Sequence, residues 1–227
     1  MCGIVGYVGT ENNAKEVIIE GLKRLEYRGY DSAGIALCRD GKVETRKHVG
    51  EIANLEKIIG DPDYDSSVGI GHTRWATHGA PSDVNAHPHS NSDNTITVVH
   101  NGIIENFVEL REWLIDEYGV KFKSDTDTEV IAHLIGIYYD GDLHQAVNRA
   151  VEQMRGAYAI GVIAAAEPDK IVAVRKDAPM VAGIGEGCNF IASDIPALLK
   201  YVKKNVLRSE EHTSELQSPQ NLVCRLL

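Results

Sequence analysis

MCGIVG, residues 1–6, opens the chain and combines a reactive side chain with the start of an apolar run. That run, at 4–8, predicts a buried β-strand, which would hold Cys2 rigidly. Removal of Met1, which the small neighbouring side chain permits, would leave Cys2 with both a thiol and an α-amine. A chain-terminal amine is a known base for activating a weak nucleophile. The stretch therefore predicts a catalytic cysteine or, taken alone, an ordinary cysteine before a core strand.

Outward from this strand, periodicity and turn signals predict further strands, several of them joined by hairpins. Asp40-Gly41 marks one hairpin, and Asn13 with Glu16 marks the capping box of a helix that ends at Gly29. The other predicted strands are 33–38, 43–49, 68–73, 95–101, 157–164, 171–175, 181–184 and 189–192, and the other helices are 52–59, 107–118, 129–139 and 143–154. Because regular βαβ alternation is missing, this order predicts antiparallel sheets with segregated helices, an α+β layered fold.

The composition is that of an acidic globular protein. Of 227 residues, 43% are hydrophobic and 25% charged, and the net charge is −10, which disfavours nucleic acid and anionic membranes as partners. No apolar run approaches the ~18 residues that span a bilayer, and the start lacks the features of a signal peptide. The four cysteines, Cys2, Cys38, Cys188 and Cys224, form no CxxC pair, which favours a reducing compartment. We therefore expect a cytoplasmic protein.

The end of the chain differs from the rest. From about residue 208 the sequence is polar without a clear period, and the last residues, 221–227, are apolar but isolated. We interpret 1–207 as one domain and 208–227 as a non-native or disordered tail, which resembles adaptor-derived sequence; the alternative is a natural flexible terminus. A tail of this kind is expected to be dispensable for stability.

A polar loop, RWATHG at 74–79, follows one predicted strand. Arg74 offers the two-pronged donor that suits a carboxylate, and Thr77 adds a hydroxyl. Trp75, near the hinge-forming Gly79, would act as a lid that excludes water. The alternative is a surface loop whose arginine pairs with an acidic side chain.

Two further segments carry polar groups that suit amide chemistry. Asn101 and the N–H of Gly102 can both donate to a developing oxyanion, although Asn-Gly is also a common turn. In the segment 124–129, an acid such as Asp127 can bind an ammonium group, but Thr126 or Asp127 can equally cap the helix that follows.

Five histidines within thirty residues raise a metal site as a rival interpretation. They are His72, His78, His87, His89 and His100. No carboxylate or cysteine completes a known ligand spacing, and open zinc sites usually have three protein ligands. We therefore expect histidines that pack loops, with no metal and no cofactor.

Together these segments resemble the class II glutamine amidotransferases, which are N-terminal-nucleophile hydrolases. The MCGIVG start carries the resemblance. The runs RLEYRGYDSAG (24–34), RWATHG, NAHPH (85–89), HNG (100–102) and SDTDTE (124–129) narrow it to the glutaminase domains of the glutamine:fructose-6-phosphate aminotransferase family. It extends from residue 1 to about 199. The fold that it implies is a four-layer αββα sandwich, in agreement with the α+β order.

The resemblance also implies roles for residues. Cys2 would attack the amide of L-glutamine, with its own amine as base, and Asn101 and Gly102 would form the oxyanion hole. For the substrate's α-carboxylate, the family pattern implies Arg74 and Thr77 with help from His78, and for the α-ammonium Asp127. Trp75 would lie on the lid, and Arg28 would support the site beside Cys2.

The resemblance ends before the sugar-isomerase domains of the family. Those domains bind fructose 6-phosphate and use the released ammonia, so this chain is expected to perform only the glutaminase half-reaction. The full-length enzymes are expected to be homo-oligomers. A domain that senses glutamine without hydrolysing it is the alternative from a different class.

Overall fold

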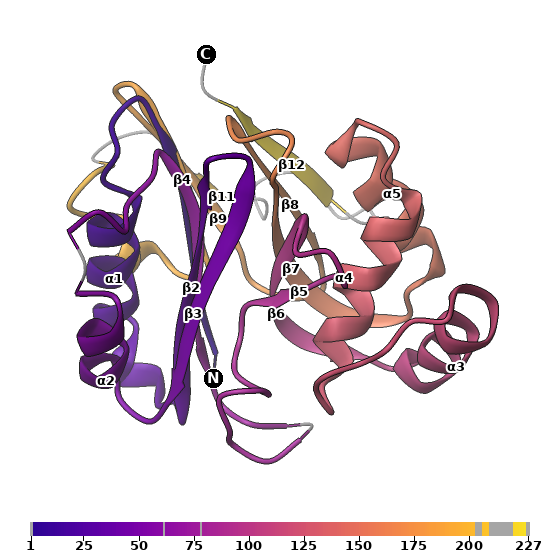
Figure 1. Cartoon of the computed structure of the whole chain (residues 1–227). Helices are drawn as coiled ribbons and strands as arrows, with labels where there is room; N and C mark the ends of the chain where they lie inside the picture. Colours follow the sequence, from indigo (N-terminus) through magenta and orange to yellow (C-terminus); the bar gives the residue numbers. More distant parts are fainter. Residues whose placement is uncertain (1, 61, 78, 203–205, 209–219, 226–227) are drawn as a thin grey trace.

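The computed structural model describes residues 2–60, 62–77, 79–202, 206–208 and 220–225. Two β-sheets lie face to face, and helices cover the outer face of each, so the chain forms four layers (Figure 1). The helices on one side are α1 (Ala14–Lys23) and α2 (Ile52–Ile58), and those on the other are α3 (Phe107–Tyr118), α4 (Asp127–Tyr138) and α5 (Leu143–Gln153). The predicted α+β sandwich of αββα type is confirmed. No helix in the described part of the chain is long and apolar enough to cross a membrane.

The first sheet has seven strands in the order β11-β9-β10-β1-β4-β2-β3, and every pair is antiparallel. Its strands are β1 (Gly3–Gly9), β2 (Ser32–Arg39), β3 (Lys42–Val49), β4 (Val68–Arg74), β9 (Val181–Gly185), β10 (Cys188–Ala192) and β11 (Val206–Arg208). The N-terminal strand β1 is central, between β10 and β4. Cys2 therefore lies at the end of a strand that neighbours hold on both sides.

The second sheet has five strands in the order β12-β8-β7-β6-β5, also antiparallel. Its strands are β5 (His89–Ser90), β6 (Ile96–Ile104), β7 (Gly156–Ala164), β8 (Lys170–Lys176) and β12 (Gln220–Arg225). Strand β5 lies between the predicted strands 68–73 and 95–101, where the sequence predicted no strand. All the predicted strands and helices occur, with ends shifted by a few residues.

Alternation along β1 connects two layers of the core. Ile4 and Val8 pack in the cluster between the sheets, whereas Val5 and Tyr7 pack in the cluster beneath α1 and α2. Gly6 faces the inner layer, where an added Cβ would lie 2.6 Å from Ile191 Cγ1. Ile191 is the cross-strand neighbour of Gly6 on β10, and its side chain, with Ile171 Cδ1 of the second sheet 3.3 Å from the added Cβ, fills the space that a side chain at residue 6 would take.

The predicted capping box of the first helix is wrong. Asn13 is the N-cap residue, but its side chain makes no capping hydrogen bond and donates instead to Glu11 Oε2 at 3.3 Å. The amide of Lys15 donates to Asp65 Oδ1 at 3.0 Å, so a residue distant in sequence supplies the cap. The helix also ends earlier than expected, at Lys23, and a separate 3-10 turn, η1, covers Glu26–Arg28 before Gly29.

Part of the predicted tail has a place in the fold. Gln220–Arg225 forms β12, which pairs with β8 from Gln220↔Arg175 to Arg225↔Lys170. A sheet edge binds a strand through backbone groups and needs little side-chain pattern, which is why the sequence did not indicate this strand. Disorder is therefore the wrong expectation for these six residues. Residues 209–219 and 226–227 lie outside the described residues, and the origin of the tail stays a prediction.

The inner layer at β1 gives a stability prediction. Gly6→Ala forces a methyl group against Ile191, and overpacking of this kind costs about 1–3 kcal/mol. At roughly 2–4 °C per kcal/mol for a domain of this size, we expect the Tm to fall by several degrees in calorimetry. Gly60→Ala is the matched control, since its nearest non-neighbouring atom is 3.5 Å away, and it should leave the Tm within about 1 °C. Equal Tm values for the two variants would contradict this account of the packing.

Candidate active site

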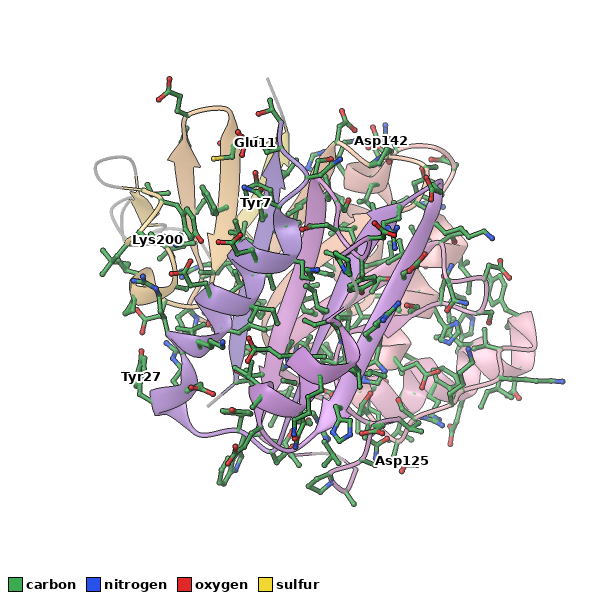
Figure 2. All side chains as sticks on the ribbon, turned by 60° about the vertical axis from the view of Figure 1, so that its left-hand side comes forward. Tyr7, Glu11, Tyr27, Asp125, Asp142 and Lys200 are labelled. Atoms are coloured by element: carbon green, nitrogen blue, oxygen red, sulfur yellow. The ribbon has the colours of Figure 1, made fainter. Side chains whose placement is uncertain are left out.

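A cavity of about 570 Å³ lies at the end of the sandwich where β1 begins. Tyr27 and Asp125, which come from the two opposite halves, mark this end of the molecule, and Glu11 and Asp142 mark the other (Figure 2). Eight of the nine predicted site residues line the cavity: Cys2, Arg28, Arg74, Trp75, Thr77, Asn101, Gly102 and Asp127. The ninth, His78, lies outside the described residues.

Four side chains hold the first residues of β1. The Cys2 carbonyl accepts from Arg28 Nη1 at 3.3 Å and from Asn101 Nδ2 at 3.2 Å. The next two amides donate to hydroxyls, Gly3 to Thr73 Oγ1 and Ile4 to Ser193 Oγ, each at 3.1 Å. Cys2 therefore has a defined position, as we expected from the apolar strand that follows it.

The thiol of Cys2 faces the loop after β4. Its Sγ accepts from the amide of Trp75 at 3.2 Å. Burial raises the pKa of the Cys2 thiol above its ordinary value, although the Trp75 hydrogen bond acts in the opposite direction. A thiol in this setting is mainly protonated at neutral pH, so it needs a base before it can act as a nucleophile.

Arg28 connects the Cys2 carbonyl to the turn after β10. Its Nη2 lies 2.8 Å from Asp194 Oδ2, and its Nη1 donates to Ser193 Oγ at 3.4 Å. The side chain of Arg28 is only 8% exposed, so this ion pair is better shielded than a surface pair. Arg28 thus contacts the residue that carries the thiol, and the supporting role that the resemblance implies stays a prediction.

Asn101 and Gly102 lie inside β6 and do not form a turn. Asn101 pairs with Ala159, and Gly102, with a φ of 124°, pairs with Tyr158. A Cβ at Gly102 would lie 2.1 Å from the Ala157 carbonyl oxygen, so glycine is required here. The turn interpretation is therefore wrong, and both residues face the cavity from the second sheet.

At the start of α4, one residue caps the helix and a different residue lines the cavity. Thr126 is the N-cap, and its Oγ1 accepts from the Glu129 amide. Asp127 is buried and lines the cavity, and its Oδ2 accepts from the Ile104 amide at 3.0 Å. The cap interpretation holds for Thr126, and the Asp127 carboxylate is placed where a ligand can reach it.

The loop after β4 is attached at both ends. Ala76 N donates to Asp31 Oδ2 at 2.5 Å, and Arg74 Nη2 donates to the Gly79 carbonyl at 3.0 Å. Arg74 is only 3% exposed, so the alternative of a surface arginine is wrong. Trp75 is 55% exposed although it lines the cavity, and its expected role as a lid stays a prediction.

The histidines form a packed cluster. The rings of His72 and His87 stack with centroids 4.2 Å apart, and His89 meets His87 edge-on at 4.9 Å. Burial lowers the pKa of His72 to about 3 and holds the pKa values of His87 and His89 well below the ordinary value, so all three are neutral. Across the described ranges, no group of three His, Cys, Asp or Glu side chains has the geometry to hold a metal ion.

Some residues at the site were not predicted. Asp177, Ala178 and Pro179 line the cavity from the segment after β8, and nothing in their local sequence indicates this. His72 Nε2 lies 2.9 Å from Asn101 Oδ1, whereas the sequence indicated only a histidine that packs a loop or, as the rival, a metal ligand. Its position at the end of a predicted strand was the available signal.

Comparison with known proteins gives one family. The model of the family described as "Glutamine amidotransferase domain" matches residues 72–200, which is more than half of the chain.

Curated relatives named glutamine–fructose-6-phosphate aminotransferase [isomerizing] include proteins from the following three organisms. The one from Clostridium perfringens is 56% identical over 211 residues, that from Aquifex aeolicus 53% over 216 residues, and that from Pyrococcus horikoshii 52% over 208 residues. These matches cover 91–95% of this chain but only 34–36% of each relative. The chain therefore spans about a third of the length of the relatives it matches.

Two solved structures share the fold. The glutamine phosphoribosylpyrophosphate amidotransferase from B. subtilis, complexed with ADP and GMP, matches with a TM-score of 0.77 and 24% identity over 100% of this chain and 49% of that chain. An allosteric regulatory enzyme of purine biosynthesis matches with a TM-score of 0.78 and 23% identity over the same shares. At this level of identity the two structures support the fold alone.

The environment of Cys2 gives a prediction about its reactivity. Because burial raises the pKa of its thiol, alkylation by iodoacetamide in the chain that retains Met1 should keep rising above the pH at which a free cysteine levels off. Pulse labelling across pH, followed by peptide mapping, measures this. Cys38 is the internal control: burial raises the pKa of its thiol to about 12, so it should stay almost unlabelled throughout. A midpoint for Cys2 below that of free cysteine would contradict the account.

Proposed function

The chain belongs to the family of glutamine amidotransferase domains, and on this premise we propose that it hydrolyses the side-chain amide of L-glutamine through a thioester on Cys2. The proposal rests on one observation: a thiol, two candidate oxyanion donors, an arginine and a carboxylate line the same cavity. These residues are Cys2, Asn101, Gly102, Arg74 and Asp127. These groups complement the reacting amide and the two charged ends of an amino acid.

The first step requires removal of Met1. The freed α-amine of Cys2, with a reference pKa of about 7.7–8.0, then takes the thiol proton. The sulfur attacks the amide carbon, and the amine passes the proton to the departing nitrogen, which leaves as ammonia. Water then cleaves the thioester, which yields glutamate and restores the thiol.

The oxyanion of each tetrahedral intermediate would be stabilised by Asn101 Nδ2 and the Gly102 N–H. These donors come from β6, whereas the nucleophile comes from β1, so the two sheets hold the reacting groups against each other. Loss of one such donor typically lowers turnover by about 10²–10³.

The substrate's charged groups would bind at opposite sides of the cavity. Arg74 and Thr77, with His78, would hold the α-carboxylate, and Asp127 would hold the α-ammonium. A substrate carboxylate that binds the Arg74 guanidinium would replace the hydrogen bond from Arg74 to the Gly79 carbonyl. This replacement would couple substrate binding to movement of the Trp75 lid.

The proposed activity is the glutaminase half-reaction of domain 1–207. The relatives are named for amination of fructose 6-phosphate, and that step would need the two thirds of their length that this chain does not span. We place the protein in the cytoplasm, with no nucleic-acid or membrane partner and no cofactor, and we expect the full-length enzyme to be a homo-oligomer.

The role of Cys2 predicts a loss of activity on mutation. Cys2→Ala should fold, as judged by an unchanged Tm, and should release no glutamate from glutamine. A glutamine analogue with an electrophile at the amide position should add once to the wild-type protein, on the N-terminal peptide. Cys188→Ala is the control and should keep both properties. Labelling at Cys38 or Cys188 would contradict the assignment.

Two further measurements test the proposed half-reaction against a glutamine sensor and against the full amination reaction. Intact mass should show that Met1 is absent from the active protein; retained Met1 with tight glutamine binding and no turnover would favour a glutamine sensor. With millimolar fructose 6-phosphate, no glucosamine 6-phosphate should form. Glutamate release should change by less than about twofold, because a ligand shifts a conformational equilibrium only when it binds one state better than the other.

The proposed role of Asp127 leads to a prediction about substrate affinity. Asp127→Asn keeps an oxygen that can accept from the Ile104 amide but removes the charge that faces the α-ammonium. A hydrogen bond to a charged group contributes about 1.5–3 kcal/mol, so KM should rise roughly 10–150-fold. Asp125→Asn, in the same segment but exposed and away from the cavity lining, is the matched control and should change KM by less than about twofold. Similar KM values for the two variants would show that Asp127 has only a structural role.

A further inference from the structure

The side-chain amide of Asn101 lies between two polar groups of opposite kind. On one side Nδ2 is 3.2 Å from the Cys2 carbonyl oxygen, and on the other Oδ1 is 2.9 Å from Nε2 of His72. The same Nε2 lies 3.0 Å from the carbonyl oxygen of His100. Asn101 is therefore in contact with both the proposed nucleophile's residue and a buried imidazole.

Two backbone carbonyls determine which way this amide points. A carbonyl oxygen only accepts, so His72 Nε2 must carry a proton to bond with His100 O. That N–H then requires an acceptor from Asn101, which is Oδ1, and this leaves Nδ2 toward the Cys2 carbonyl. A rotated amide would place oxygen against oxygen at Cys2 and N–H against N–H at His72.

The imidazole itself is held firmly. His72 is fully buried on β4, where its backbone pairs with Ile4 on one side and Gly34 on the other. Its ring stacks on His87 with an interplanar angle of 27°. Because burial holds the pKa of His72 near 3, the ring stays neutral at working pH and keeps a single ring proton.

We propose that His72 is a positioning residue, which acts through Asn101 and keeps the amide nitrogen turned toward the substrate oxyanion. The amide nitrogen has two hydrogens: one is donated to Cys2 O, and the other points to the oxyanion formed in the cavity. Without the His72 N–H, rotation of the amide would present an oxygen to the developing negative charge. The inference rests on the proposed glutamine hydrolysis and deepens it.

The first test compares two substitutions. His72→Leu removes the donor and should lower kcat by at least about tenfold, up to the roughly 10²–10³ expected for complete loss of an oxyanion donor. KM should change by less than about threefold, because the substrate's charged ends bind elsewhere. His72→Gln is the matched control: its amide N–H can reach the position of Nε2, and kcat should stay within about fivefold of the wild type. Equal losses in both variants, or a loss mainly in KM, would overturn the proposal.

A double-mutant cycle tests whether His72 acts through Asn101. In an Asn101→Ala background the amide is already absent, so adding His72→Leu should lower kcat by less than about threefold. If the two losses multiply, His72 affects the reaction by another route and the proposal is wrong.

A measurement without turnover separates this inference from the proposed function. Nitrogen-15 NMR of the wild-type protein at pH 7 should show His72 protonated at Nε2 and not at Nδ1. The Asn101 side-chain amide should show one slowly exchanging proton that becomes fast in His72→Leu. Absence of glutamate release from the processed wild type would count against the proposed function, whereas an Nδ1-protonated or charged His72 would overturn the positioning role.

Discussion

The carbonyl oxygen of Cys2 is the acceptor on which the arrangement of the site depends. Arg28, from the turn after α1, and Asn101, from β6, both donate to it. These two residues belong to opposite halves of the sandwich, so one backbone oxygen joins the halves at the point where the cavity opens. A cysteine at the end of a chain would otherwise fray, because terminal residues are ordered only when something ties them down.

Close packing between the sheets makes this junction possible. β1 is central in its sheet and contributes to apolar clusters on both of its faces, so it cannot shift without disturbing two layers of the core. At Gly6 the side chain of Ile191 from the neighbouring strand β10 fills the space over the inner face, and the chain has glycine there. At Gly102, which lines the cavity, an added Cβ would lie 2.1 Å from the carbonyl oxygen of Ala157 on β7, so glycine lets β6 and β7 pair there.

Some buried polar groups near the cavity have hydrogen-bond partners that limit their possible orientations. Glu129 accepts from the amides of Lys123 and Ser124, which positions the segment before Asp127. Burial acts to raise the pKa of its carboxyl, but hydrogen bonds from His133, Ser124 and Lys123 outweigh burial and lower that pKa to about 2. Lys47 donates to the carbonyls of Val84, Ala86 and Pro88, and so holds the loop that carries His87. Breaking one of these hydrogen bonds would leave a buried polar group unpaired, which costs free energy. The networks therefore keep the site rigid.

Local pattern in the sequence was sufficient to predict the helices and strands and to select most of the residues that line the cavity. Alternating apolar residues and the Asp40-Gly41 turn are read over a few neighbouring residues, and the strands that they predict occur. The motifs around Cys2, Arg74, Asn101 and Asp127 are equally local, and these four residues line one cavity, while their roles stay predictions. His78 and most of the tail lie outside the described residues, so their predictions stay open.

Only the tertiary structure decided what depends on residues far apart in the chain. Asp65 replaced Glu16 as the partner for the start of α1, β12 found the free edge of β8, and His72 met Asn101 from the other sheet. The physical reason is that a hydrogen-bonding group takes whichever partner the packed core brings within about 3 Å, and packing of this kind leaves no periodic trace in the sequence. The sequence therefore indicated the residue types that suit the chemistry, whereas the packing of the two sheets determined the orientations of their side chains.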